Sequence, residues 1–474
     1  MVENELRELI KQIQLRGCES QTTEVKSANG GCPEKLYDTI SSFSNQNSGG
    51  VFVFGLNEKE DFKKVGVYNA QDLQKRVMEY CEQMTPVVRP IFTVYDEGGM
   101  VFVAAEIPPV DITDRPCFKT AKGRLHGSYI RVGDADKPMT EYEVYSYEAF
   151  RKKYQDDVRG IERASFATLD QTKLDAYIAL KVKERPHLAL TSPTQQYELT
   201  GITRDGQITM TAILLFGIYP QAFFPQLSII ATCVPNEKMG IVDNAGNRFL
   251  DSKRFEGTLP DMLDGALTFV RTNTRVATKI DPLTGNRIDQ PQYPMDAVRE
   301  AILNALVHRD YSIHTEGMPI QLILYSDRME IVNPGGLYGR LTLDQLGNVQ
   351  PDTRNPVLVT AMETLGETEN RYSGIPTIRH SMKESGLPDP LFFNSREAFS
   401  VTLYNRKDDV VDEKGLLRFC SIPRSREEIA KYLNIPSVQY ALHRYLDPLV
   451  QSGLIQMTLP DTPRSKNQRF ITAK

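Results

Sequence analysis

The stretch AVREAILNALVHRDY, residues 297–311, carries the most informative pattern in the sequence. Its apolar residues recur at helical spacing, and a step of four places Glu300, Asn304 and His308 on one face of a predicted helix. Asparagine is a poor helix former, so its presence at position 304 in a helix interior indicates that the side chains of this polar face make a specific contact. A face that is simply exposed to solvent is the alternative, with His308 as an ordinary hydrogen-bonded, half-buried side chain.

The sequence after this helix predicts two strands and a glycine-rich loop. Two apolar strands are predicted on either side of a turn at Asp327-Arg328, and the loop Asn333–Leu337 follows the second strand. The short motifs RNP, at 354–356, and RYSGI, at 371–375, come next. As an ordered set, the motifs within residues 285–405 closely resemble the ATP-binding C-terminal region of bacterial divergent-AAA regulators, which is GHKL-like. The resemblance implies a GHKL-like α/β sandwich in this region.

The same resemblance implies a role for each motif residue. Asn304 would ligate Mg²⁺ on the nucleotide phosphates, and Glu300 would take the place of the general base that orients water in an ATPase. The loop Asn333–Gly336 would meet the adenine and the phosphates, since backbone amides of such loops can hold anions. The residues expected to bind ATP or ADP are Asn304, His308, Asn333, Gly335, Gly336 and Gly374.

Two positions depart from the GHKL pattern. Asn333 stands where the related enzymes have an aspartate that reads the adenine amino group. Tyr372 stands where they have a glycine, and its bulk could obstruct a phosphate. We therefore predict ATP or ADP with Mg²⁺ as the cofactor, and hydrolysis that is weak at most.

A second set of ordered motifs lies within residues 15–145. Glu19 and Glu24 precede a predicted helix that Gly49-Gly50 ends, a buried strand follows at 51–54, and YIRVG at 129–133 closes the set. This order resembles the Schlafen/Alba-like family and implies an α/β head over residues 1–150.

In vertebrate Schlafen relatives, two glutamates and an aspartate form a metal-dependent RNA-cleaving site. Glu19 and Glu24 match the two glutamates, and clustered carboxylates of this kind hold Mg²⁺ or Mn²⁺. The third position departs from the pattern, because Asn57 stands there and Glu58 follows it. Alternatively, Glu24 and Lys26 form a solvated pair on one strand face. We favour nucleic-acid binding, with Lys26 and Arg131 on phosphates, over cleavage.

Residues 415–474 predict a winged helix-turn-helix. Ser425 and Glu428 form a capping box, a second helix is predicted at 438–446, and the strands of a wing are predicted at 454–459 and 469–472. From Lys414 onwards there are ten Lys and Arg residues and four Asp and Glu residues, in a chain of net charge −5. This local excess of positive charge favours DNA, although small winged helices also bind proteins. The expected DNA contacts are Gln439, Tyr440, His443, Arg444, Arg464, Lys466 and Arg469.

Composition sets the wider limits. The 474 residues suggest about three domains, and the six cysteines form no C-x-x-C pair, which indicates reduced thiols. The amino terminus lacks the apolar core of a signal peptide, and the apolar run 208–219 is too short to span a bilayer. We predict this run to be a core strand, residues 151–163 to be a connecting helix, and the protein to be cytoplasmic without a membrane partner.

The prediction for the whole chain is an α+β multidomain protein: the Schlafen/Alba-like head at 1–150, a middle domain at 151–405 and the winged helix. We interpret it as a bacterial DNA-binding transcriptional regulator whose GHKL-like region senses a nucleotide. The alternative is a metal-dependent RNA or DNA endonuclease, for example in phage defence, and a third interpretation is a scaffold with degenerate pockets. RNA and a second copy of the chain are alternative partners.

Overall fold

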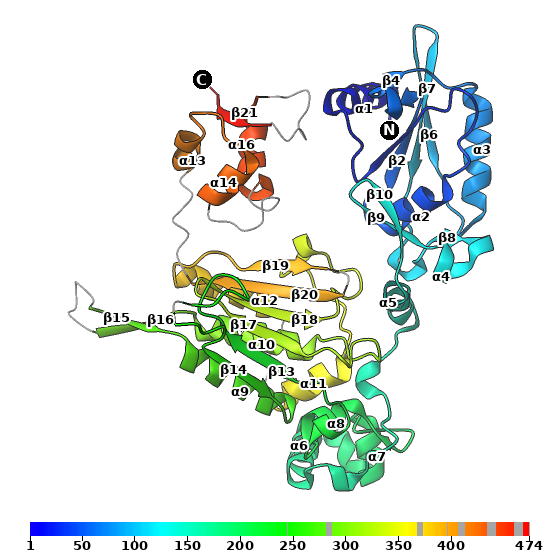
Figure 1. Ribbon diagram of the computed structural model, residues 1–474. Helices are drawn as coiled ribbons and strands as arrows, with labels where there is room; N and C mark the ends of the chain where they lie inside the picture. Colours follow the sequence, from blue (N-terminus) through cyan, green and yellow to red (C-terminus); the bar gives the residue numbers. More distant parts are fainter. Residues whose placement is uncertain are drawn as a thin grey trace. The chain divides into compact units, whose positions relative to one another are not determined.

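The computed structural model describes the chain except residues 244, 281–286, 367–372, 396, 406–412, 434–441, 459–467 and 474. Figure 1 shows an N-terminal part, a middle part built on a large sheet, and a small C-terminal part, each of which is described here by itself. Among the described residues, no helix combines the length and the apolarity that crossing a bilayer requires.

The N-terminal part is a four-stranded sheet with helices on both faces. The strand order is β1 (Thr23–Lys26), β2 (Gly50–Phe54), β7 (Met100–Ile107) and β6 (Ile91–Glu97), with only the β1–β2 pair parallel. The helices are α1 (Glu3–Arg16), α2 (Tyr37–Asn45), α3 (Ala70–Glu82), α4 (Gly123–Gly127) and α5 (Glu141–Lys152). Alternation along β2 explains the two layers, because Phe52 and Phe54 pack with α2 and α3, whereas Val53 packs with α1.

Short strand pairs complete this part. They are β3 (Leu56–Asn57) with β4 (Lys63–Lys64), β5 (Met84–Thr85) with β8 (Phe118–Lys119), and β9 (Tyr129–Val132) with β10 (Ala135–Pro138). The strand after the first predicted helix and the closing strand at 129–132 form as predicted, as β2 and β9. The helix also forms, as α2, but it ends at Asn45, before Gly49-Gly50.

The middle part contains a six-stranded sheet with helices on one face (Figure 1). The strand order is β14 (Asp251–Phe255), β13 (Ile229–Cys233), β17 (Ile320–Leu324), β18 (Arg328–Pro334), β20 (Ala398–Tyr404) and β19 (Leu391–Asn394). The covering helices are α9 (Leu259–Asn273), α10 (Met295–Val307) and α12 (Gly374–Glu384). The helix predicted within 297–311 is confirmed by α10, although it ends at Val307 and His308 is its C-cap. The turn at Asp327-Arg328 is confirmed by the β17–β18 hairpin.

Smaller elements surround this sheet. The hairpin of β15 (Val276–Ile280) and β16 (Arg287–Pro291) projects from it, as Figure 1 shows. A helical group consists of α6 (Gln171–Glu184), α7 (Pro193–Leu199), α8 (Met210–Phe216) and α11 (Pro356–Thr364), with the short pair β11 (Thr203–Arg204) and β12 (Gln207–Ile208).

Two predictions for the middle part are wrong. The run 208–219 is predicted to be a strand, but Met210–Phe216 within it forms helix α8. Every residue of this helix is buried, so no exposed polar face reveals the helical period. The predicted connecting helix at 151–163 is absent, since α5 ends at Lys152 and only a 3₁₀ turn, Asp156–Val158, follows. A tertiary contact fixes this segment in place of the helix that its sequence favours. The buried Asp157 carboxylate accepts hydrogen bonds from the backbone N–H groups of Val357, at 2.9 Å, and Leu358, at 3.2 Å.

The C-terminal part has its own small core. Its described elements are α13 (Glu413–Phe419), α14 (Arg426–Tyr432), a π-helical turn (Leu442–Leu446), α16 (Asp447–Gln451), β21 (Ile455–Met457) and β22 (Phe470–Thr472). The predicted capping box forms, because the Ser425 N–H donates to the Glu428 carboxylate at 2.8 Å and the Glu428 N–H donates back at 3.2 Å. The two strands of the predicted wing pair antiparallel. Most of the predicted second helix lies outside the described residues.

Candidate functional site

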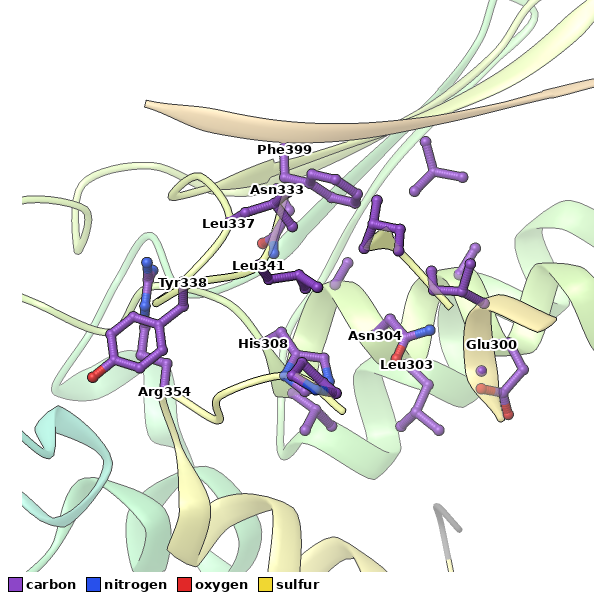
Figure 2. A pocket seen from close by; sticks show the side chains of 18 of the residues that line it. Glu300, Leu303, Asn304, His308, Asn333, Leu337, Tyr338, Leu341, Arg354 and Phe399 are labelled. Atoms are coloured by element: carbon purple, nitrogen blue, oxygen red, sulfur yellow. The ribbon is translucent and has the colours of Figure 1, made fainter. Parts of the chain in front are cut away.

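One pocket gathers the residues that the sequence motifs single out (Figure 2). Its walls are α10, the end of β18 with the loop after it, the segment 337–354, the start of α12, and β20. The predicted residues among its lining are Glu300, Asn304, His308, Asn333, Gly335, Gly336 and Gly374. They come from three separate stretches of the chain, so the pocket exists only because the fold brings those stretches together.

The α10 wall presents the predicted polar face at its helical spacing. Glu300, Asn304 and His308 all line the pocket, and the first residue of α12, Gly374, lies directly against Glu300 and Asn304. A Cβ atom at Gly374 would lie 2.8 Å from Asn304 Nδ2 and 2.9 Å from Glu300 Oε2. Only glycine lets the start of α12 approach so closely, and a helix N-terminus carries partial positive charge and free N–H groups.

The sheet wall ends in a second close approach. Gly335 has φ +93°, and a Cβ atom there would lie 2.5 Å from the Asp310 side chain and 2.6 Å from Arg354 Nη1. The position therefore requires glycine for its conformation as well as for its space. The glycine-rich run after Asn333 thus lets the chain turn tightly beside the end of α10.

The RNP motif links the pocket wall to the helices. Arg354 pairs with Asp310 at 3.2 Å, donates to the Gly336 carbonyl at 3.3 Å and lies over the Tyr338 ring at 5.1 Å. The fully buried Asn355 donates to the carbonyls of Val307, at 2.9 Å, and Arg309, at 2.8 Å, at the end of α10.

Arg354 and Tyr338 were missed as site residues by the sequence analysis. The RNP motif was the only feature of the sequence that pointed to Arg354. The order of residues in that motif does not indicate which of the three side chains faces the pocket.

Two side-chain amide atoms in the pocket are buried without a hydrogen-bond partner among the described residues. They are Asn304 Nδ2 and Asn333 Oδ1. Leaving such an atom unsatisfied costs about 1–3 kcal/mol, which a ligand that supplies the partner recovers. His308 keeps some exposed surface, but the surrounding protein and the nearby Arg354 lower its pKa to about 4, so it is neutral at pH 7. Beside the charged Glu300 and Arg354, the pocket thus offers neutral hydrogen-bonding groups on a largely apolar wall.

The second predicted cluster, in the N-terminal part, forms around a cation. The Arg131 guanidinium lies 2.7 Å from the Glu24 carboxylate, 3.7 Å from Glu19 and 3.1 Å from Asp136, with its side chain 1% exposed. Lys26 also pairs with Glu24, as the alternative interpretation of that strand predicts, but Glu24 is buried, so the pair is not the solvated one of that interpretation.

The other residues of the predicted cleavage motif lie differently. Asn57 caps the 3₁₀ turn that contains Glu58, by accepting from the Lys59 N–H at 3.2 Å. Within the described ranges, no three His, Cys, Asp or Glu side chains are arranged to hold a metal ion. The position between the two predicted metal-binding glutamates is instead occupied by Arg131.

This placement removes Arg131 from the residues that could contact a phosphate, because its side chain is buried and its charge is already neutralised. In the C-terminal part, Arg469 is half-exposed and pairs with Glu428 at 3.1 Å. His443 and Arg444 lie in the π-helical turn. The remaining predicted DNA contacts, Gln439, Tyr440, Arg464 and Lys466, lie outside the described residues.

The Glu19 carboxyl provides a test of this cluster by pH. Burial, followed by the charge of Glu24, raises the pKa of Glu19 to about 7, from 4.5. The folded state therefore holds a proton that the unfolded state releases, and stability is expected to fall as pH rises from about 4.5 to 7. Glu19→Gln should remove this pH-dependent loss of stability. Compared with the wild type, the variant should therefore gain on the order of 1 kcal/mol of unfolding free energy at pH 8 that it does not gain at pH 5.

The measurement is thermal unfolding across this pH range, with the exposed Glu60→Gln as the control. An identical pH dependence in the wild type and in Glu19→Gln would contradict the prediction.

Three segments of the chain match known protein families. Residues 19–140 match the family described as Schlafen, AlbA_2, and residues 317–403 match HATPase_c_4, described as putative ATP-dependent DNA helicase recG C-terminal. Residues 414–471 match the Fic-like C-terminal domain of proteins described as filamentation induced by cAMP protein. The chain thus combines a Schlafen AlbA_2 domain with a RecG-like and a Fic-like C-terminal segment. The predicted Schlafen/Alba-like resemblance is confirmed, whereas the winged helix-turn-helix stays a prediction.

Solved structures add two likenesses. The DIP2311 protein from Corynebacterium diphtheriae is 18% identical with a TM-score of 0.40, over 99% of this chain and 97% of that chain. The N-terminal domain of a putative ATP-dependent DNA helicase RecG-related protein from Nitrosomonas europaea is 22% identical with a TM-score of 0.24, over 28% of this chain and 93% of that chain. At these TM-scores neither likeness carries an argument. No curated protein matches the chain.

Proposed function

We propose that this protein is a nucleotide-responsive, DNA-binding transcriptional regulator whose middle part binds ATP or ADP with Mg²⁺. The observation that carries the proposal is the convergence of all seven predicted residues on one pocket that contains two buried, unsatisfied amide atoms. The match of residues 317–403 to an ATPase-type family supports the same class of ligand.

The two ends of the pocket suit different parts of a nucleotide. The apolar side chains of Ile331, Leu341 and Phe399 form a slot that fits a flat base. At the other end, Glu300 and Asn304 offer the oxygen ligands that Mg²⁺ prefers, beside the N-terminus of α12, which suits phosphate. Bound Mg²⁺ would neutralise phosphate charge there, and Asn304 is the residue we expect to hold it.

We do not assign a hydrolytic step to this pocket. Glu300 is the acidic side chain on the pocket face of α10, and the start of α12 at Gly374 lies directly against it. A pocket that binds a nucleotide without hydrolysing it suits a sensor, because the fraction of pockets occupied then follows the nucleotide concentration.

Asn304→Ala is expected to weaken Mg²⁺-dependent ATP binding by at least tenfold, because it removes both a metal ligand and a polar atom of the pocket. Isothermal titration calorimetry of the full chain, with ATP or ADP and with or without Mg²⁺, measures this. Asp296→Asn, an exposed position on the same helix, serves as the control. If the wild type releases no heat with either nucleotide at millimolar concentration, the proposal fails and the pocket is a retained scaffold.

The rival function, a metal-dependent endonuclease, rests on Glu19 and Glu24. Incubation of the pure protein with labelled RNA and DNA in Mn²⁺ tests it, and cleavage that Glu24→Gln abolishes would favour it over a regulator. The Arg131 guanidinium between the two carboxylates argues against it, since a metal ion there would face a fixed positive charge.

A further inference from the structure

Asn333 is the polar residue of the base slot. It is 5% exposed, and it occupies the position in β18 that pairs with Phe399 in β20. Burial alternates along β18, so Asn333 shares the buried face of Met329 and Ile331. Figure 2 shows its side chain beside Phe399 and Leu341, on the side of the pocket that faces α10.

The surroundings of Asn333 leave its amide as the polar group that a ligand base in this slot has to pair with. Its Oδ1 atom has no hydrogen-bond partner in the part of the chain that the structure describes. The nearby side chains of Ile331, Leu341 and Phe399 cannot supply one. A ligand that enters this slot therefore has to pair with the amide, or else leave a buried polar atom unsatisfied.

An amide differs from a carboxylate in the pattern it can pair with. A carboxylate only accepts hydrogen bonds, whereas the asparagine amide carries one acceptor and a two-proton donor that exchange places when the group rotates. In one orientation it accepts from the adenine amino group and donates to the neighbouring ring nitrogen. In the other it donates to guanine O6 and accepts from the guanine ring N–H.

We propose that Asn333 makes the pocket a purine-nucleotide site that takes guanine nucleotides about as well as adenine nucleotides. The inference rests on the proposed nucleotide function and adds which bases the site accepts. Pyrimidine nucleotides offer similar edges, but their smaller ring leaves part of the apolar slot unfilled, so they bind more weakly.

The test is calorimetric titration of the full chain with Mg²⁺ and ATP, GTP or CTP. In the wild type we expect dissociation constants for ATP and GTP within tenfold of each other, and a weaker one for CTP. Asn333→Asp, which keeps the shape but removes the donor, should weaken GTP relative to ATP by at least tenfold. Asn348→Asp, the same change at an exposed position in segment 337–354, should leave the ratio unchanged.

Each outcome separates this inference from the function on which it rests. Binding of ATP with GTP more than tenfold weaker in the wild type overturns the inference and leaves the nucleotide function intact. An unchanged ratio in a folded Asn333→Asp variant also overturns it. If neither purine nucleotide binds, the proposed function itself fails. The wild-type ratio decides the matter even if Asn333→Asp does not fold.

Discussion

Replacing Arg131 with alanine is expected to lower the free energy of unfolding of the N-terminal part by about 3–5 kcal/mol, the usual cost of breaking a buried ion pair from one side. The guanidinium is 1% exposed and lies within 4 Å of three carboxylates. Without it, Glu24 and its neighbours keep their negative charges in a buried site. Hydrogen–deuterium exchange of the amides in β1 and β2 measures the loss where it occurs.

Two matched variants sharpen this prediction. Arg124 pairs with Glu148, but both side chains are partly exposed, so Arg124→Ala should cost less than about 1 kcal/mol. Adding Glu24→Gln to Arg131→Ala should restore part of the lost stability, because it removes an unpaired buried charge. Equal stability of Arg131→Ala and Arg124→Ala would show that the cluster is not held together by its central cation.

The result also bears on the rival nuclease function. A set of carboxylates kept for a metal ion gains nothing from a permanent cation among them, whereas a structural network depends on it. If Arg131→Ala stays folded and gains Mn²⁺ binding, the carboxylates are poised for a metal and the nuclease interpretation becomes stronger. If it unfolds, Glu19 and Glu24 serve the fold.

The nucleotide pocket was predictable because local patterns encode its parts. Helical spacing alone places Glu300, Asn304 and His308 on one face, and α10 confirms it. The turn at Asp327-Arg328 fixes the β17–β18 hairpin and thereby the position of Asn333 at the end of a strand. What joined these parts into one site was the resemblance of the ordered motifs, since no local pattern states which helix faces which strand.

The failures share a physical cause, which is that burial and long-range pairing leave no local signal. Helix α8 is apolar all round, so its sequence also suits a buried strand. Arg131 resembles an exposed cation in the sequence, yet it pairs with Glu24, which lies more than a hundred residues away. Arg354 enters the pocket only because Asn355 ties its segment to the end of α10.

Removing the C-terminal part by truncation after Asn405 is expected to abolish most of the DNA affinity of the protein. From Lys414 onwards there are ten basic and four acidic residues, whereas the whole chain is acidic. In the N-terminal part, the expected contact Arg131 is buried, and Lys26 and also Arg124 are paired with carboxylates. If four or five phosphates are neutralised, the affinity of the full chain should fall on the order of 10²-fold between 50 and 200 mM salt.

Fluorescence anisotropy with labelled duplex DNA over a salt series measures both affinity and slope. In the full chain, Arg464→Ala should weaken all sequences alike and flatten the slope by about one unit, whereas Arg444→Ala should relax sequence preference at a cost of roughly 1–3 kcal/mol. The truncated chain should still bind the nucleotide, because every residue of the pocket precedes Asn405. If it keeps the affinity and salt slope of the full chain, the DNA contacts lie within residues 1–405, and the N-terminal part becomes the next to test.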